Sequence, residues 1–175
     1  MATLTAQVAA TTTPNDWNLA AGASKVAAVT SPDDDATTYL SSGSSSDTIQ
    51  TFTVSPALST GDTITQIDIT ARARRSGGSN ANFKVGYAFT PNGGGSQSDE
   101  SSNNLSTNSW TDFTSSFSSL SVVWGSALTI YIKNTQAKSV DVTTLNITIT
   151  YTPGGGGGSA QPPRTLHQVR MRINA

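Results

Sequence analysis

The chain has 175 residues, of which 35% are hydrophobic and 12% are charged, and its net charge is −1. Globular domains carry about 25% charged residues, so the charged fraction is roughly half the usual one, and 27 Thr and 25 Ser fill the difference. The scarcity of Glu, Lys and Leu excludes a coiled coil or a helix bundle, the small net charge argues against disorder, and no run of about 18 apolar residues is present that could span a membrane.

Alternation of apolar and polar side chains with period two predicts the strands. One apolar and one polar face is typical of half-buried antiparallel strands. The alternation is weak in four segments and clear in four others. In chain order, strands are expected over 3–9 (weak), 25–30 (weak), 47–54 (weak), 67–74, 83–90, 110–117 (weak), 128–133 and 145–151.

Two segments interrupt this alternation. The aromatic residues of 110–117 are not evenly spaced, which predicts a bulge or a turn there. Val140 and Val142 precede Leu145 by an odd offset, which predicts a bulge near residues 143–144.

About eight strands, separated by short runs rich in Ser, Gly, Asp and Asn, predict two packed antiparallel sheets. No stretch of residues 1–153 has helical spacing with caps. The loops are long and the strands uneven in length, which favours a jelly-roll-like β-sandwich over a propeller or a closed barrel. The predicted class is therefore all-β.

The chain changes character after Pro153, so we expect a sandwich domain over 1–153 followed by an appendage. Residues 154–163 begin with five Gly and end with two Pro, which indicates a flexible linker with a reach of about 17 Å. Residues 164–175 form a basic, amphipathic arm. The domain carries seven Lys or Arg against 11 Asp or Glu, a net of −4, whereas the remainder of the chain carries three Arg and no acid.

This charge difference predicts that the arm docks on a partner. As a strand, its apolar residues would face one way and its arginines the other; as a helix, its apolar residues would line one side. Both forms remain open, as do a frayed terminus and an added synthetic linker. The expected partner-binding residues are Arg164, Leu166, Val169, Arg170, Met171, Arg172 and Ile173.

The sequence offers little for catalysis. The chain has no Cys, and its one His, His167, lies in the arm without an acid partner, which argues against a Ser-His-Asp triad. A glycosidase needs two carboxylates across a cleft, but the one Glu, Glu100, falls in a polar segment expected to be a loop. Asp68 is expected on an exposed strand face beside arginines. We therefore expect no enzyme and no cofactor.

Three binding functions can be weighed in the same way. The run Asp33-Asp34-Asp35 is expected to be a turn, with Ca²⁺ binding left open. Arg72, Arg74 and Arg75 make a basic patch that is too small for a nucleic-acid binder in an acidic domain.

A glycan remains a possible ligand, because β-sandwich lectins stack sugar rings on exposed aromatic side chains. The chain has three tryptophans, Trp17, Trp110 and Trp124. The last two lie near apolar runs, so the expected place for them is the core.

The start of the chain, residues 1–8, has neither a basic segment nor a long apolar one, so a signal peptide is not predicted and synthesis in the cytoplasm is expected.

An ordered series of short motifs resembles a group of tailed-phage structural proteins. The resemblance covers roughly residues 15–153. The motifs are Trp17, Pro32–Leu40, Asp47–Phe52, Gly61–Ile67, Ala71–Arg75, Trp110–Phe113 and Ile149–Pro153. It implies a non-enzymatic β-sandwich component of the virion and supplies no catalytic residues.

Together these points predict a phage capsid decoration protein that docks through its C-terminal arm and is made in the host cytoplasm. The expected partners are further copies of the chain, as a homo-oligomer, and a major capsid or tail protein, with neither nucleic acid nor membrane. A tail or fibre component is one alternative. A carbohydrate-binding module or adhesin, which would bind a glycan, is the other.

Overall fold

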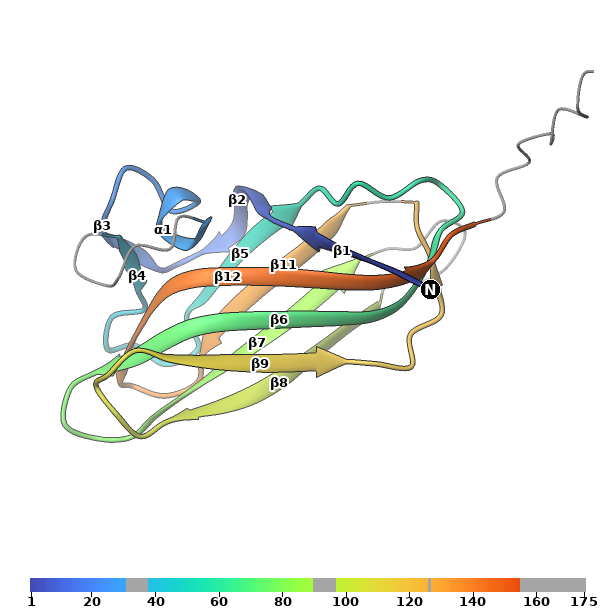
Figure 1. Ribbon diagram of the computed structural model, residues 1–175. Helices are drawn as coiled ribbons and strands as arrows, with labels where there is room; N and C mark the ends of the chain where they lie inside the picture. The colour runs from blue at the N-terminus through green and yellow to red at the C-terminus, as the bar shows by residue number, and fades with distance from the viewer. Residues whose placement is uncertain (31–37, 90–96, 126, 155–175) are drawn as a thin grey trace, which may run out of the picture.

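The computed structural model describes residues 1–30, 38–89, 97–125 and 127–154. Two antiparallel sheets pack face to face (Figure 1). One has seven strands, β1 (Ala2–Ala6), β3 (Asn18–Ala21), β4 (Tyr39–Ser41), β6 (Thr63–Ser76), β9 (Thr111–Phe117), β10 (Val122–Val123) and β12 (Ser139–Thr152). The other has five, in the order β2 (Val8–Asn15), β5 (Ile49–Val54), β11 (Leu128–Asn134), β7 (Ala81–Phe89) and β8 (Gln97–Leu105).

The space between the sheets holds the core. Along β11, buried side chains alternate with half-buried ones, so that Leu128, Ile130 and Ile132 point inward. Ile67 and Ile69 of β6 point toward them from the other sheet and are likewise fully buried. Burying each such side chain contributes about 1.5–3 kcal/mol, which is how a chain with few large apolar residues holds two sheets together. The predicted all-β, jelly-roll-like sandwich is confirmed.

The two longest strands, β6 and β12, form the centre of the seven-stranded sheet. Their register shifts between Val142 and Thr144, which confirms the bulge predicted there. The extra residue restores the inward orientation of Leu145 and the apolar residues that follow.

Several expectations about single elements are wrong. Residues 25–30 form no strand, because Ser24 caps a short helix, α1 (Ala27–Thr30), by accepting a hydrogen bond from the Ala27 amide at 3.1 Å. Segment 3–9 is split, since β1 and β2 belong to different sheets.

Two further differences concern β8 and β9. β9 pairs with β6 without a register shift, and Trp110 precedes the strand, which is why the aromatic spacing looked irregular. The polar segment 97–105, expected to be a loop, is the strand β8 at the edge of the five-stranded sheet. This strand is held in the sheet by its backbone pairing with β7, and its sequence lacks the apolar alternation from which a strand is predicted.

Candidate binding groove

The outer face of the five-stranded sheet carries one row of residues that crosses all five strands. The pairing register places Thr12, Thr51, Tyr131, Gly86 and Glu100 side by side, on β2, β5, β11, β7 and β8. Because side chains alternate between the faces of a sheet, the four side chains of this row point away from the core, and Gly86 contributes only backbone. The row is the floor of a groove.

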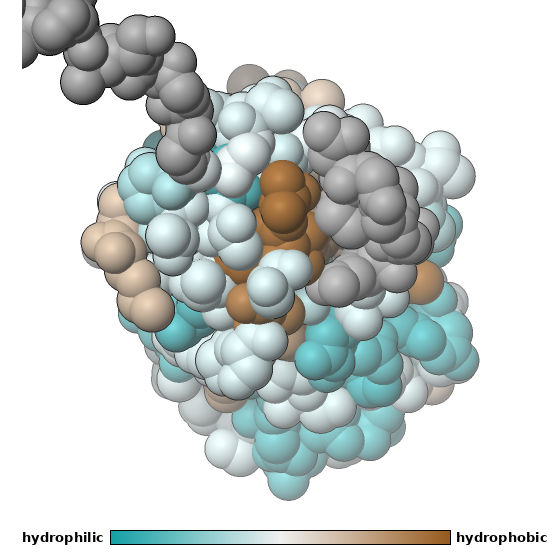
Figure 2. Space-filling model, turned by 90° about the vertical axis from the view of Figure 1, so that its right-hand side faces the viewer, coloured by the Kyte–Doolittle hydropathy of each residue, from teal (hydrophilic) through white to brown (hydrophobic). Residues whose placement is uncertain are grey.

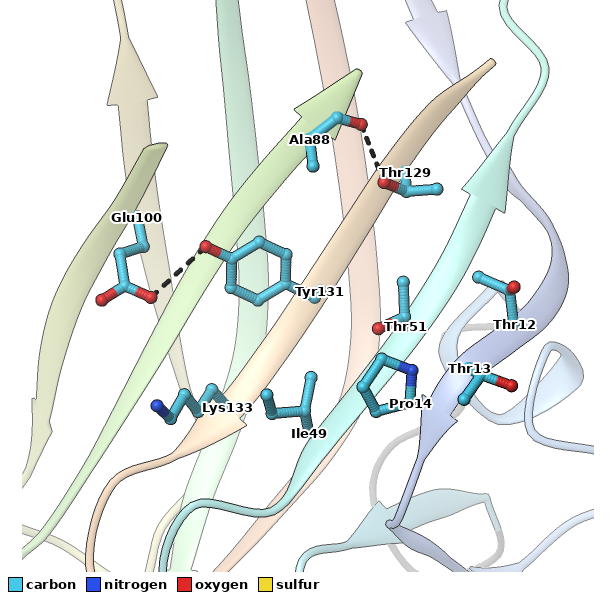
Figure 3. Close-up of a pocket in the computed structure, with 10 residues that line it drawn as sticks. All are labelled: Thr12, Thr13, Pro14, Ile49, Thr51, Ala88, Glu100, Thr129, Tyr131 and Lys133. Atoms are coloured by element: carbon cyan, nitrogen blue, oxygen red, sulfur yellow. Dashed lines mark hydrogen bonds between the residues drawn. The ribbon is translucent and has the colours of Figure 1, made fainter. Parts of the chain in front are cut away.

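This groove has a volume of about 420 Å³ (Figure 3). β2 closes one side of it through Thr13 and Pro14, while the strand β8 contributes Glu100 on the opposite side. The described residues that line it are Thr12, Thr13, Pro14, Ile49, Thr51, Ala88, Glu100, Thr129, Tyr131 and Lys133. A concave site with an aromatic ring and a few polar groups has the composition of a ligand site.

The ring of Tyr131 lies flat across the sheet because its neighbour is a glycine. A Cβ atom built on Gly86 would stand 2.4 Å from Cζ and 2.5 Å from the hydroxyl oxygen of Tyr131. The ring therefore occupies the space that any other side chain at position 86 would need. Figure 3 shows it lying over β7 with its hydroxyl group toward Glu100.

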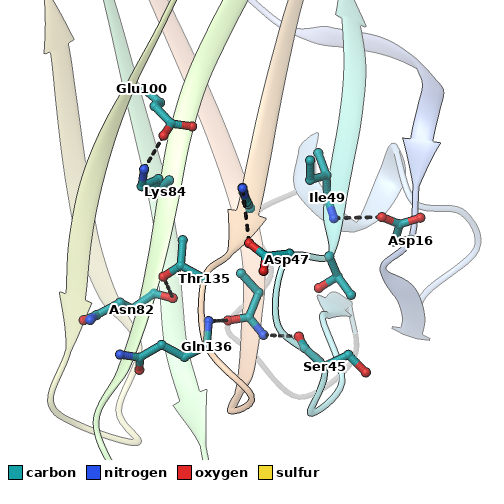
Figure 4. A network of polar contacts seen from close by, with 12 residues as sticks. Asp16, Ser45, Asp47, Ile49, Asn82, Lys84, Glu100, Thr135 and Gln136 are labelled. Carbon is teal, nitrogen blue, oxygen red and sulfur yellow. Dashed lines mark hydrogen bonds and ion pairs between the residues drawn. The ribbon is translucent and has the colours of Figure 1, made fainter.

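The Tyr131 hydroxyl donates a hydrogen bond to Oε2 of Glu100 at 3.3 Å. Lys84, on the neighbouring strand β7, forms an ion pair with Oε1 of the same carboxylate (Figure 4). Lys133 pairs with Asp47 at 3.3 Å, and the Asp47 side chain is 72% exposed. The groove thus combines a fixed aromatic ring with one carboxylate and one ammonium group.

This arrangement changes the pKa of both partners of the hydrogen bond. Burial, together with the negative charge and hydrogen bond of Glu100, raises the pKa of Tyr131 to about 12. The hydrogen bond from Lys84 lowers the pKa of Glu100 from its usual range. At neutral pH the tyrosine is a hydrogen-bond donor and the glutamate an anion.

We expect Glu100→Gln to lower the pKa of Tyr131, because the substitution removes an anion that opposes ionisation of the phenol. NMR titration of the Tyr131 Cζ resonance measures this shift. The pKa of Tyr131 is higher in the folded protein than in the unfolded chain. Its contribution to the free energy of unfolding is therefore fully present below pH ~10 and is lost as the pH rises toward 12. Asp112→Asn, on the other sheet, is the control and should leave the Tyr131 titration unchanged. An unchanged titration in Glu100→Gln would contradict the assignment.

A second cluster of aromatic side chains lies on the seven-stranded sheet. The guanidinium carbon of Arg74 is 4.4 Å from the ring centroid of Trp110 and 5.3 Å from that of Tyr39. Arg74 Nε donates to Oδ2 of Asp141 at 3.1 Å, and the Asp141 side chain is only 3% exposed. The faces of both rings are therefore covered by Arg74, which indicates that these aromatic side chains stabilise the fold and do not form a ligand-binding surface.

The three tryptophans differ in environment. Trp17 is 1% exposed and donates its indole N–H to the Thr48 carbonyl at 3.1 Å, so it belongs to the core. Trp124 packs against the core while remaining partly exposed, and Trp110 stacks on Arg74. None of them lies in the groove. Tyr131 takes the place that sequence reasoning considered only for tryptophans.

The other two arginines of β6, Arg72 and Arg75, contact polar groups at the surface. Arg72 pairs with Asp112 at 3.3 Å, where the two side chains are 33% and 60% exposed. Arg75 donates to Asn108 at 2.8 Å. Asp68 accepts two hydrogen bonds from Gln66 on the same strand, at 2.9 and 2.8 Å.

The residues predicted to bind a partner all lie outside the described residues. They are Arg164, Leu166, Val169, Arg170, Met171, Arg172 and Ile173. The same is true of His167 and of the Asp33-Asp34-Asp35 run, so the Ca²⁺ alternative stays open. Within the described part of the chain, no group of three or more His, Cys, Asp or Glu side chains is placed to hold a metal ion. No helix there is long and apolar enough to cross a membrane.

Sequence reasoning missed the site because its residues look ordinary in the sequence. The sequence predicts a loop at Glu100, whereas β8 places this residue beside Tyr131 and Lys84. The one local signal is Gly86 inside an alternating strand, since an isolated glycine there indicates close approach of another group.

No protein-family model matches the chain, and no curated protein matches its sequence. Similarity to solved structures is clear at the level of the fold. The CBM22-1 xylan-binding domain of Paenibacillus barcinonensis Xyn10C superimposes with a TM-score of 0.52 at 14% identity, covering 83% of this chain and 92% of that domain.

Two longer structures match with similar scores. The tandem CBM22-1–CBM22-2 domain of the same Paenibacillus protein gives a TM-score of 0.53 at 14% identity, over 89% of this chain and 48% of that one. The CBM22-1–GH10 modules of Clostridium thermocellum endo-1,4-beta-D-xylanase 10B, complexed with xylohexaose, give 0.53 at 13% identity, over 76% of this chain. This chain spans about a quarter of that xylanase structure, 24% of its length.

Proposed function

We propose that this chain is a non-catalytic carbohydrate-binding module and that its glycan lies in the groove over Tyr131. The observation that carries the proposal is the flat, half-buried ring of Tyr131, held in place by Gly86 and Glu100. A pyranose presents an apolar face of C–H groups and a rim of hydroxyl groups. The ring of Tyr131 can stack on the C–H face of the sugar. Glu100 can accept hydrogen bonds from the sugar hydroxyl groups, and Lys133 can donate to them.

The similarity in fold supports the proposal, because the matched Paenibacillus domain is described as xylan-binding and the Clostridium structure contains xylohexaose. A glycosidase would need a second carboxylate opposite the first. Among the described residues that line the groove, Glu100 is the one carboxylate, and Lys84 and Tyr131 engage both of its oxygens. Both points favour binding over hydrolysis.

The assignment to a virion remains a prediction from the resemblance in sequence, as does capsid decoration. A glycan-binding module is compatible with an adhesin carried on a particle. Negative-stain imaging of particles labelled against this chain would test that location independently of glycan binding.

A glycan array followed by isothermal titration with the best ligand, and with xylohexaose, tests the proposed function. We expect saturable binding by the wild type and about two- to tenfold weaker binding by Tyr131→Ala, since contacts of an aromatic ring contribute about 0.5–1.5 kcal/mol. Tyr151→Ala is the control, because Tyr151 is half-buried in β12 of the other sheet. Absence of binding to every glycan, or equal loss in both variants, would overturn the proposal.

A further inference from the structure

The last described residue, Gly154, is fixed at one end of the sandwich. Its amide donates to Oδ1 of Asp62 at 2.9 Å. A Cβ atom on Gly154 would stand 2.2 Å from the carbonyl oxygen of Gly61, so the two backbones are in direct contact. The Asp62 carbonyl accepts a hydrogen bond from the Trp124 amide at 2.6 Å. The chain therefore leaves the domain next to the loops that precede β6 and follow β10.

The same end of the molecule carries four apolar residues that are exposed or partly exposed, Leu58, Leu120, Val123 and Trp124, which are together called the end patch here. Val123 is 43% exposed, and the other three pack on the core while remaining partly exposed. Figure 2 shows apolar surface gathered at the centre of this end.

A hollow of about 350 Å³ adjoins Trp124. Its lining includes Val54, Pro56 and Ala127. Apolar surface beside a concavity is a feature of sites that bind another chain.

The sequence beyond Gly154 has the length and composition to cover this patch. Twenty-one residues follow Gly154, and those up to Pro163 make a linker with a reach of about 17 Å. The arm then carries four apolar residues, Leu166, Val169, Met171 and Ile173, among three arginines. Its charge of +3 is opposite to the net charge of −4 over residues 1–153.

We propose that residues 164–173 dock on the end patch of their own domain. A Gly-rich linker of this length would keep the arm near the patch at an effective concentration in the millimolar range, which favours the same chain over a second copy. The apolar side chains of the arm would cover Val123 and Trp124. The groove lies on the outer face of the five-stranded sheet, so this inference stands independently of glycan binding.

Limited proteolysis of the full chain with trypsin tests the docking, because trypsin cleaves after arginine. Cleavage after Arg170 and Arg172 is compared with cleavage of a synthetic peptide of residues 159–175. We expect cleavage in the full chain to be at least tenfold slower than in the peptide. Val123→Asp should raise the rate to within twofold of the peptide. Leu19→Asp, which changes an exposed residue of β3 elsewhere in the fold, should leave the protection intact.

A substitution in the arm avoids any effect on folding of the domain. In full-length Ile173→Asp, hydrogen exchange of the Val123 and Trp124 amides should become several-fold faster than in the wild type. The trypsin digestion is repeated at protein concentrations from about 1 to about 100 μM. Protection of the arm that increases with protein concentration would show docking on a second copy and overturn the proposal. Peptide-like cleavage of the wild type, or protection that survives Val123→Asp, would also overturn it.

Discussion

Replacing Gly86 with Ala is expected to destabilise the domain by roughly 2–3 kcal/mol and to weaken the proposed glycan binding by up to about as much as Tyr131→Ala does. The added Cβ atom would stand 2.4 Å from Cζ of Tyr131 and 2.6 Å from the carbonyl oxygen of Asp99. The tyrosine ring can rotate away, but the carbonyl belongs to the neighbouring strand β8 and moves only with its backbone. The substitution therefore removes the flat ring from the groove and strains the β7–β8 pairing.

Urea denaturation and isothermal titration measure the two effects. Gly78→Ala is the matched control, because a Cβ atom there would meet nothing within 4 Å. We expect that control to keep wild-type stability and affinity within about 0.5 kcal/mol. If Gly86→Ala binds glycan with wild-type affinity, Tyr131 is not the platform for the sugar.

Replacing Arg74 with Ala is expected to cost about 2–4 kcal/mol of stability. The side chain of Asp141 is 3% exposed, and Arg74 is the partner of its carboxylate, with Nε at 3.1 Å from Oδ2. Removing the guanidinium leaves a buried anion without a counter-ion. It also removes the cation that packs on the rings of Trp110 and Tyr39.

Arg72→Ala on the same strand provides the comparison. The Arg72 and Arg74 side chains are similarly exposed, at 33% and 29%, but Asp112, an acid with which Arg72 pairs, is 60% exposed. Water solvates Asp112 after the substitution, so we expect a loss of less than about 1 kcal/mol. Equal losses in the two variants, measured by thermal or urea denaturation, would show that burial of the acid does not decide the cost.

The sequence by itself determined the fold class and much of the central sheet structure. Alternation with period two placed the strands that contain Ile67, Val85, Ile130 and Ile147, because one buried face leaves that pattern wherever a sheet covers a core. The odd offset after Val142 even located the bulge in β12. These are local properties of a single strand.

Only the tertiary structure decided where the groove lies and which residues line it. Tyr131 and Glu100 are 31 positions apart, and their contact depends on the pairing of β11 with β7 and of β7 with β8. The sequence of β8 is mostly polar and has no apolar alternation. It becomes an edge strand through backbone pairing with β7, which its own sequence does not indicate. A site built across several strands follows from their register, which comes from long-range pairing and leaves no periodic signal within any one strand.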